Sequence, residues 1–217
     1  MHTITLFKNK NDAINIAHTL SKPSKMPCDS YSLPIEYCKT GAKMAKIEGS
    51  ICSKCYASKG SYTWPASVIA MDKRINSINN PLWVDAMIKL INNKPYFRWH
   101  DSGDIQSIEH FDKICQIANA LPNTMFWIPT REYSIIKDYA KKHTIPKNLI
   151  VRLSAMFIDE RVKIPQSLAN IPNITTANVH SKNALGFECI ASKQNNECRD
   201  CRACWNTDIK EVSYKQH

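Results

Sequence analysis

Four cysteines near the C-terminus have a spacing that points to metal chemistry. Cys198, Cys201 and Cys204 follow one another at steps of three, and Cys189 lies nine residues upstream, which gives C-x8-C-x2-C-x2-C. Such a run lets a loop wrap a cluster, and bacterial ferredoxins use it together with a remote fourth cysteine. The array therefore predicts an iron–sulfur cluster, most simply of the 4Fe–4S type. A structural zinc ion, usually held by two separated C-x2-C pairs, is the alternative, and thiols without metal or disulfides are the third.

A second cysteine-rich stretch lies near the N-terminus. It contains Cys28, Cys38, Cys52 and Cys55, within a loop long enough to fold back onto a cluster. One or two clusters are therefore expected. Cys115 is the remaining cysteine, and it lies on the apolar face of a helical pattern over residues 108–118. A cysteine in an apolar stripe behaves as a small hydrophobic residue, so we expect Cys115 in the core.

The composition describes one globular domain, residues 1–217, in a reducing compartment. The apolar fraction is 43%, and no apolar run is long enough to span a bilayer or serve as a signal peptide. Without an export signal, nine cysteines favour metal binding over disulfides. The net charge of +10 permits a nucleic-acid partner, but the basic residues are scattered and bound thiolates would offset part of the charge, so this partner is not favoured.

Extended and helical patterns alternate through the centre of the chain. Strands are expected over residues 96–100, 125–129, 149–154 and 174–180, with starts 24 to 29 residues apart and helical patterns between them, of which the one near residues 165–170 is weak. A further short strand is possible at residues 4–7. This is the spacing of βα units, whose right-handed crossovers give a parallel sheet. Four or five strands are too few for a closed barrel, so the fold class is α/β, a partial, open βα barrel with mostly parallel strands. Cysteine-rich loops at 28–62 and 184–205 flank the βα units at 64–180.

Polar residues at the expected strand ends are candidates for the active site. His100 and Asp101 follow the first strand and Arg131 follows the second, and we take these three as candidate catalytic residues. Asp104 could instead cap the next helix. In parallel βα folds the functional face lies beyond the carboxyl ends of the strands, so we expect both cysteine stretches to meet there.

Several blocks resemble the phage "gene product 88" domain family. They lie at residues 33–41, 49–62, 97–104, 126–132 and 198–205. The resemblance implies a phage-encoded protein acting in the bacterial host cytoplasm, and it brings no assigned reaction. The metal ligands that it supports are Cys38, Cys52, Cys55, Cys189, Cys198, Cys201 and Cys204. Cys28 is not part of the pattern, which leaves three N-terminal cysteines and one cluster iron free for a ligand.

A more distant likeness is to radical S-adenosylmethionine enzymes. Cys52-x2-Cys55-Tyr56 is similar to the end of their C-x3-C-x2-C motif. The position four before Cys52 is Glu48, so Cys38 would have to replace the missing cysteine, and no glycine-rich block for the cofactor's methionine is evident.

Two functions from different classes follow, and a radical S-adenosylmethionine-like enzyme is a further alternative. The first is an iron–sulfur protein, with enzymatic activity uncertain, whose cluster lies at a substrate or ligand site at the strand-end face; the substrate is an unknown small molecule. The second is a nonenzymatic zinc or iron–sulfur protein that binds nucleic acid or a host factor. No membrane association is expected.

Overall fold

The expected βα units form a seven-stranded, entirely parallel sheet. The computed structural model describes residues 7–24 and 26–216. The strands are β1 (Ser30–Tyr31), β2 (Tyr96–Trp99), β3 (Met125–Thr130), β4 (Leu149–Ser154), β5 (Ile174–His180), β6 (Phe187–Glu188) and β7 (Glu211–Lys215). Their order is β1-β2-β3-β4-β5-β7-β6, so the sheet is open, with β1 and β6 at its edges. The predicted α/β class and open βα arrangement are confirmed.

The four central strands lie where the sequence predicts them, and three further strands extend the sheet. β1 and β6 have two residues each, which is too short for a periodic pattern to be visible. β7 buries the adjacent residues Val212 and Ser213 and pairs in parallel with both β5 and β6. The possible strand at residues 4–7 lies almost wholly outside the described residues.

Six α-helices accompany the described strands. They are α1 (Lys10–Ala17), α2 (Lys39–Met44), α3 (Pro65–Ser77), α4 (Trp83–Ile91), α5 (Ile108–Ala120) and α6 (Tyr133–Ala140). Local chemistry sets their starts: Asn9 forms a capping box with Asp12, Pro65 opens α3, and the Ser107 hydroxyl accepts from the N–H of His110. The weak helical pattern near residues 165–170 is a 3₁₀ turn, Gln166–Leu168.

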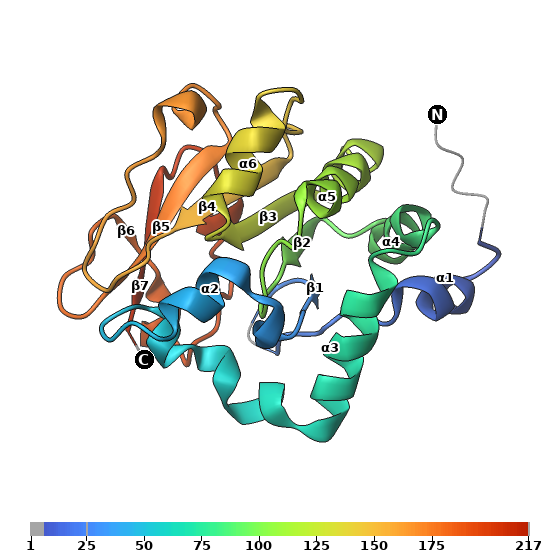
Figure 1. Cartoon of the computed structure of the whole chain (residues 1–217), viewed down its shortest axis with the longest axis horizontal. Helices are drawn as coiled ribbons and strands as arrows, with labels where there is room; N and C mark the ends of the chain where they lie inside the picture. The colour runs from blue at the N-terminus through green and yellow to red at the C-terminus, as the bar shows by residue number, and fades with distance from the viewer. Residues whose placement is uncertain (1–6, 25, 217) are drawn as a thin grey trace.

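Helices cover one side of the sheet. In Figure 1, α4, α5 and α6 stand in a row along that side, and α1 packs beside α4. Strand residues that face the helices build the apolar core, among them Phe97, Trp99, Phe126, Ile128, Val151 and Leu153. Cys115 is 1% exposed in this core, as predicted.

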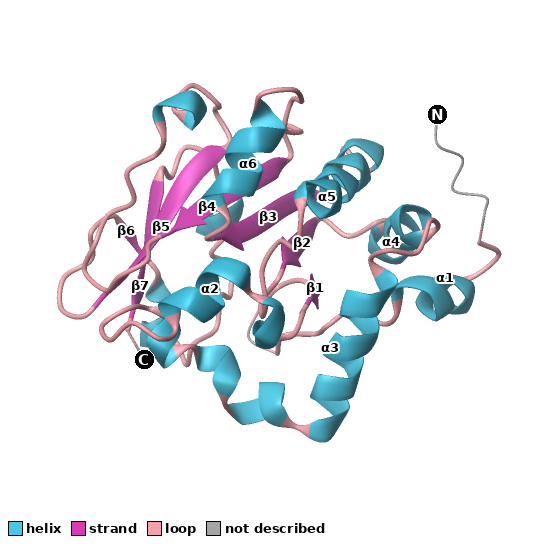
Figure 2. Ribbon diagram, viewed as in Figure 1, coloured by secondary structure: helices cyan, strands magenta, loops and turns pink. Residues whose placement is uncertain are grey.

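The opposite side of the sheet has no such cover and carries charged and aromatic side chains. Arg98, Trp127 and Arg152 alternate with the core residues of β2, β3 and β4, so they point away from the helices. We call this side the open face. The chain between β5 and β7, mostly loop in Figure 2, returns across it and places Trp205 against Trp127, with ring centres 5.4 Å apart.

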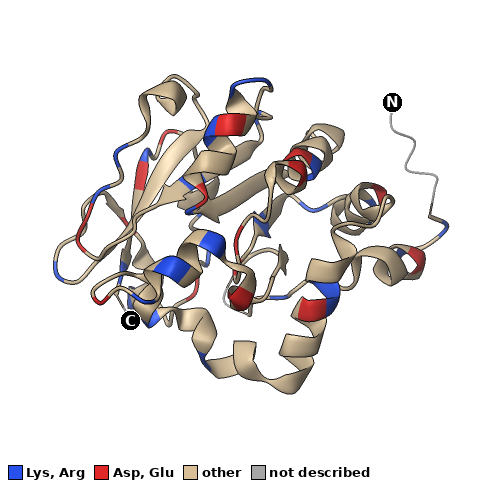
Figure 3. Cartoon of the chain, in the orientation of Figure 1, with Lys and Arg blue, Asp and Glu red and all other residues tan. Residues whose placement is uncertain are grey.

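Charges of both signs are distributed over the described elements, as Figure 3 shows. Each helix in the described residues is too short or too polar to cross a bilayer.

Candidate metal centre

Four cysteines converge against the open face. Cys189, Cys198, Cys201 and Cys204 line one small pocket, and we call them the C-terminal cysteine group. The rest of the lining is apolar, from Phe187, Ala191, Ala203, Trp205 and Val212. Left-handed backbone at Asn195 and Asn196 turns the chain between the first two cysteines, which brings Cys198 back toward Cys189. The set predicted from the spacing is therefore one spatial group.

Arg152 fixes the segment that carries this group. Its side chain is fully buried and donates five hydrogen bonds to backbone carbonyls. The acceptors are Cys204 (3.1 Å), Ala203 (2.8 Å), Asn206 (3.0 Å), Ile209 (3.0 Å) and Thr176 (3.4 Å). Within the described residues it makes no ion pair with a carboxylate. Arg152 on β4 thus holds the loop that carries Cys204 in place through that loop's own backbone.

The thiols of the C-terminal group lie in a low-dielectric setting. Burial raises the pKa of Cys204 to about 12, and its sulfur lies 3.2 Å from the Tyr214 hydroxyl. Burial also raises the pKa values of Cys189 and Cys198, and each lies near enough to Cys201 for the two thiols to repel as anions. Ligand binding here would have to displace thiol protons.

The spacing of the side chains bears on what could bind. Among the described residues, no three side chains of His, Cys, Asp or Glu come close enough together to hold a single metal ion. Zinc would require four sulfurs about 2.3 Å from one atom. A cubane cluster instead takes each cysteine on a different iron, so its ligands stand further apart. Four cysteines in an apolar pocket are a donor set that either kind of site can use.

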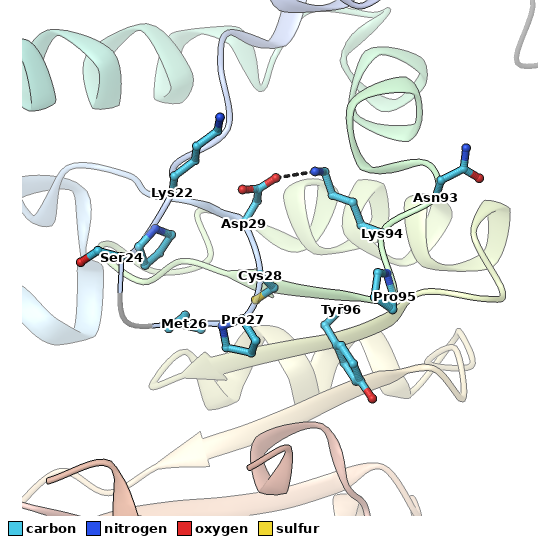
Figure 4. Close-up of a pocket in the computed structure, with 11 residues that line it drawn as sticks. Lys22, Ser24, Met26, Pro27, Cys28, Asp29, Asn93, Lys94, Pro95 and Tyr96 are labelled. Atoms are coloured by element: carbon cyan, nitrogen blue, oxygen red, sulfur yellow. Dashed lines mark ion pairs between the residues drawn. The ribbon is translucent and has the colours of Figure 1, made fainter. Parts of the chain in front are cut away.

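Cys28 lies beside the C-terminal group, although the sequence resemblance gave it no role. Burial raises its pKa to about 12, and Arg98 and Cys198 are both close enough to contribute. Cys28 lines a pocket of about 420 Å³. Figure 4 shows its side chain near the Asp29–Lys94 ion pair. Sequence spacing could not reveal this fifth thiol, because β1 and β2 bring residue 28 to the site from a distant part of the chain.

Cys38, Cys52 and Cys55 converge at the carboxyl ends of the strands, and we call them the N-terminal cysteine group. Burial is the main cause that raises the pKa of Cys38 to about 12, and the nearby Asp104, Cys55 and Cys52 contribute to this rise. A Cβ on Gly41 would lie 3.7 Å from the sulfurs of both Cys38 and Cys52, and 3.0 Å from the Cβ of Cys38. Glycine in α2 therefore leaves room between two of the three thiols.

Polar side chains from the strand ends surround this group. Glu132 accepts hydrogen bonds from the N–H and hydroxyl of Thr40, at 2.7 and 2.9 Å, which ties the start of α2 to the end of β3. Arg131, a predicted site residue, lies close enough to Cys52 to oppose the rise in its pKa that burial causes. Its Nε donates to the carbonyl of Ala155 at 2.9 Å.

Asp104 faces the N-terminal cysteine group and does not cap α5, since Ser107 occupies that position. Its carboxylate accepts from the Thr130 hydroxyl (2.6 Å) and from the N–H groups of Ile105 (2.8 Å) and Arg131 (2.9 Å). Burial raises its pKa to about 6 despite these bonds. Of the two roles considered from the sequence, the structure places it at the site.

The other two predicted catalytic residues occupy different positions. His100 is 2% exposed and stands behind the strand end, with its ring centre 5.3 Å from that of His110. Asp101 is tied by the hydroxyls of Ser30, Ser32 (2.7 Å) and Tyr62 (3.0 Å). Asp101 thus organises the loop beside the N-terminal group, whereas His100 belongs to the core.

Sequence reasoning gave Arg98 no role of its own. It lies on the open face between the two groups, and its Nη2 is 3.2 Å from the Tyr56 hydroxyl. Its positive charge acts to lower the pKa values of Cys28, Cys198 and Cys204, against the effect of burial. Its Nε is buried and has no hydrogen-bond partner within the described part of the chain. The sequence feature that could have pointed to Arg98 is its position as the one charged residue in the aromatic strand β2.

Comparison with known proteins supports one relationship. No curated protein and no solved structure matches the chain. The model of the gene product 88 family matches residues 5–207, which includes both cysteine groups and the whole βα region. The chain therefore belongs to the gene product 88 family of phage proteins.

Proposed function

We propose that this protein is an iron–sulfur protein with two unlike cluster sites. The C-terminal cysteine group holds a 4Fe–4S cluster through four thiolates. The N-terminal cysteine group holds a second cluster through three thiolates, with one iron left for a small-molecule substrate. The observation that carries the proposal is the convergence of four cysteines in one apolar pocket with two guanidinium groups close by.

The charge balance supports a cluster at the C-terminal group. A 4Fe–4S centre with four thiolates carries a charge of about −2 in its common oxidised state. Arg152 and Arg98 form no ion pair with a carboxylate in the described residues, and buried cations are costly without an anionic partner. The two positive charges of Arg98 and Arg152 would balance the charge of about −2 on such a cluster.

The surroundings of the N-terminal group support a ligand site. Three thiolates leave a fourth position on a cubane cluster, and Arg131 stands nearby with a guanidinium suited to a carboxylate or phosphate. Asp104, held by three donors, supplies a carboxyl group at the same place. The expected substrate is thus a small anionic molecule, met in the cytoplasm of the bacterial host.

Metal analysis after anaerobic purification tests this function. We expect about eight irons and eight acid-labile sulfides per chain, with a broad absorbance shoulder near about 400 nm. Cys201→Ser and Cys55→Ser should each lose about half of the iron.

Cys115→Ala is the matched control, because that thiol lies in the apolar core, away from both groups. It should retain all of the iron at a cost of about 1 kcal/mol. Stoichiometric zinc without sulfide, after growth with ample iron, would overturn the proposal.

A further inference from the structure

The pocket that Cys28 lines has the size of a small-molecule site. Its volume is about 420 Å³, within the range of about 300–1,000 Å³ that is typical of such sites. Residues 22–24 and 26–29 form one wall, and residues 93–96, where the chain enters β2, form the other. Two backbone hydrogen bonds between Ser21 and Ser30, at 2.8 and 2.9 Å, join the two ends of the first wall. Backbone pairing therefore gives this wall a fixed place in the fold.

The charged groups around the pocket are mainly positive. Lys22 lines it and makes no ion pair with any described residue, whereas the Lys94 ammonium is bound to the Asp29 carboxylate at 2.5 Å. The guanidinium carbon of Arg202 lies 5.3 Å from the centre of the Tyr96 ring, which is also part of the lining. One neutral ion pair and these further cations give the pocket a positive field, which attracts anions.

Arg98 lies beside this lining with donors that lack good acceptors. Tyr96 and Arg98 are two residues apart on β2, so their side chains are neighbours on the open face. Nη1 of Arg98 contacts the sulfur of Met26, a lining residue, at 3.2 Å, and a thioether is a weak acceptor. Among the described residues its buried Nε has no partner, and Nη2 has the Tyr56 hydroxyl. A carboxylate or a phosphate is the acceptor that this planar fork binds best.

Much of the remaining lining is apolar and suits the body of an organic molecule. In Figure 4 the charged ends of Lys22 and Lys94 lie to one side of Cys28, and the Tyr96 ring lies to the other. The apolar part of the wall consists of Pro23, Met26, Pro27, Pro95 and Tyr96. Cationic and apolar surfaces thus meet in one pocket.

We propose that this pocket binds a small organic oxyanion, a molecule with a carboxylate or phosphate group and a short apolar body. The oxyanion takes the place of the Met26 sulfur beside Arg98, since three rotatable bonds allow a methionine side chain to move aside. Lys22 adds a second positive charge, and the apolar body lies against Tyr96. The site is separate from the ligand position proposed at the N-terminal cysteine group, and it requires no metal.

Isothermal titration calorimetry on the full chain tests the site. The probes are benzoate and phenyl phosphate, which carry the same ring on different oxyanions, and benzamide, which carries the ring without a charge. We expect at least one of the two anions to bind and benzamide to bind far more weakly. The tighter of the two anions identifies the preferred group.

Two variants change the charge of the pocket in opposite directions. Lys22→Gln should raise the dissociation constant about threefold, the effect of one exposed charge pair. Asp29→Asn frees Lys94 from its ion pair and should lower the dissociation constant by a similar factor, a result that misfolding cannot imitate. Lys137→Gln is the matched control, because it makes the same charge change at an exposed position of α6, and it should leave the affinity unchanged.

A third variant tests the contact with the guanidinium. Arg98→Lys keeps the charge but loses the planar fork, and it should weaken binding about tenfold, as expected for a lost hydrogen bond to a charged group.

Three results would overturn the proposal. The first is no binding of either anion, and the second is binding of benzamide as tight as that of the anions. The third is an equal affinity in the unsubstituted protein, Lys22→Gln and Asp29→Asn.

Discussion

Both cysteine groups offer thiol sulfur atoms, but the side chains around the two groups differ in kind. The C-terminal group is enclosed by apolar side chains on the open face, and the arginines on β2 and β4 are its charged neighbours. The N-terminal group lies at the carboxyl ends of the strands, where Asp104, Glu132 and Arg131 approach it. The number of cysteines also differs, four in the first group and three in the second.

In the proposed function this difference would separate two tasks. A cluster with four thiolates would have no vacant position, whereas a cluster with three thiolates beside acidic and basic side chains could bind and orient a ligand. Under that proposal the surrounding side chains, more than the cysteines, would assign a role to each group.

Substitution of Arg152 should produce the largest loss of stability of the changes considered, and it should affect the C-terminal group. Arg152→Lys cannot reproduce five hydrogen bonds from one planar fork, and buried carbonyls would be left unsatisfied. We expect a loss of about 3–5 kcal/mol in the free energy of unfolding, measured with denaturant, because each buried carbonyl left unsatisfied costs about 1–3 kcal/mol, and we expect loss of the C-terminal iron.

Arg161→Lys is the control, since this arginine is exposed and pairs with Glu211 at the surface. Its effect should be below about 0.5 kcal/mol. If Arg152→Lys kept its full iron content and stability, the loop would not depend on this anchor.

Gly41→Ala should affect the N-terminal group alone. The new methyl group would enter the space between the sulfurs of Cys38 and Cys52, although alanine usually stabilises a helix by about 1 kcal/mol relative to glycine. We therefore expect loss of about half of the iron with no loss of helix, by metal analysis and circular dichroism. Ala42→Ser, one residue along the exposed side of α2, should keep all of the iron. Equal iron content in the two variants would show that metal binding does not need the space between the sulfurs of Cys38 and Cys52.

A third prediction concerns the two buried histidines, His100 and His110, and the dependence of stability on pH. It does not require metal at either cysteine group. Burial lowers the pKa of His100 to about 4 and that of His110 well below its usual value of 6.5. Both remain neutral in the folded chain while the unfolded chain takes up protons below pH 6.5. Stability is therefore complete above pH 6.5 and falls as the pH drops toward 4, on the order of 1.4 kcal/mol per pH unit for each histidine.

Unfolding curves between pH 7 and 4.5 measure this slope. His110→Gln should reduce it, whereas His143→Gln, at an exposed position, should not. An unchanged slope in His110→Gln would mean that this histidine is protonated in the folded protein.

Much of the sheet was predictable because four strands stand out as apolar segments in the sequence. β2 to β5 and the helices between them follow from alternating apolar segments, and Cys115 follows from one apolar helical stripe. β1 and β6 have two residues each, and their existence depends on pairing with distant strands. Local sequence carries no signal for such pairing.

The candidate site was predictable where the ligands are close in sequence. The C-x2-C steps identified Cys198, Cys201 and Cys204, and the structure gathers them with Cys189. Arg98, Arg152 and Cys28 reach the site only through the register of the sheet, so their roles could not be read from neighbouring residues. His100 was predicted as a site residue from its position after a strand, yet its side chain is buried in the core. A position at the end of a strand does not decide which way a side chain points.

The most direct test of the difference between the groups is the response of their electron paramagnetic resonance signals to an added ligand. Reduced, anaerobic protein is titrated with a small thiolate, which can bind an iron that has no cysteine. The account predicts that one signal shifts and the other does not, that the shift persists in Cys201→Ser, and that it disappears in Cys55→Ser. A shift that survives in Cys55→Ser, or no shift in the unsubstituted protein with two clusters, would contradict it.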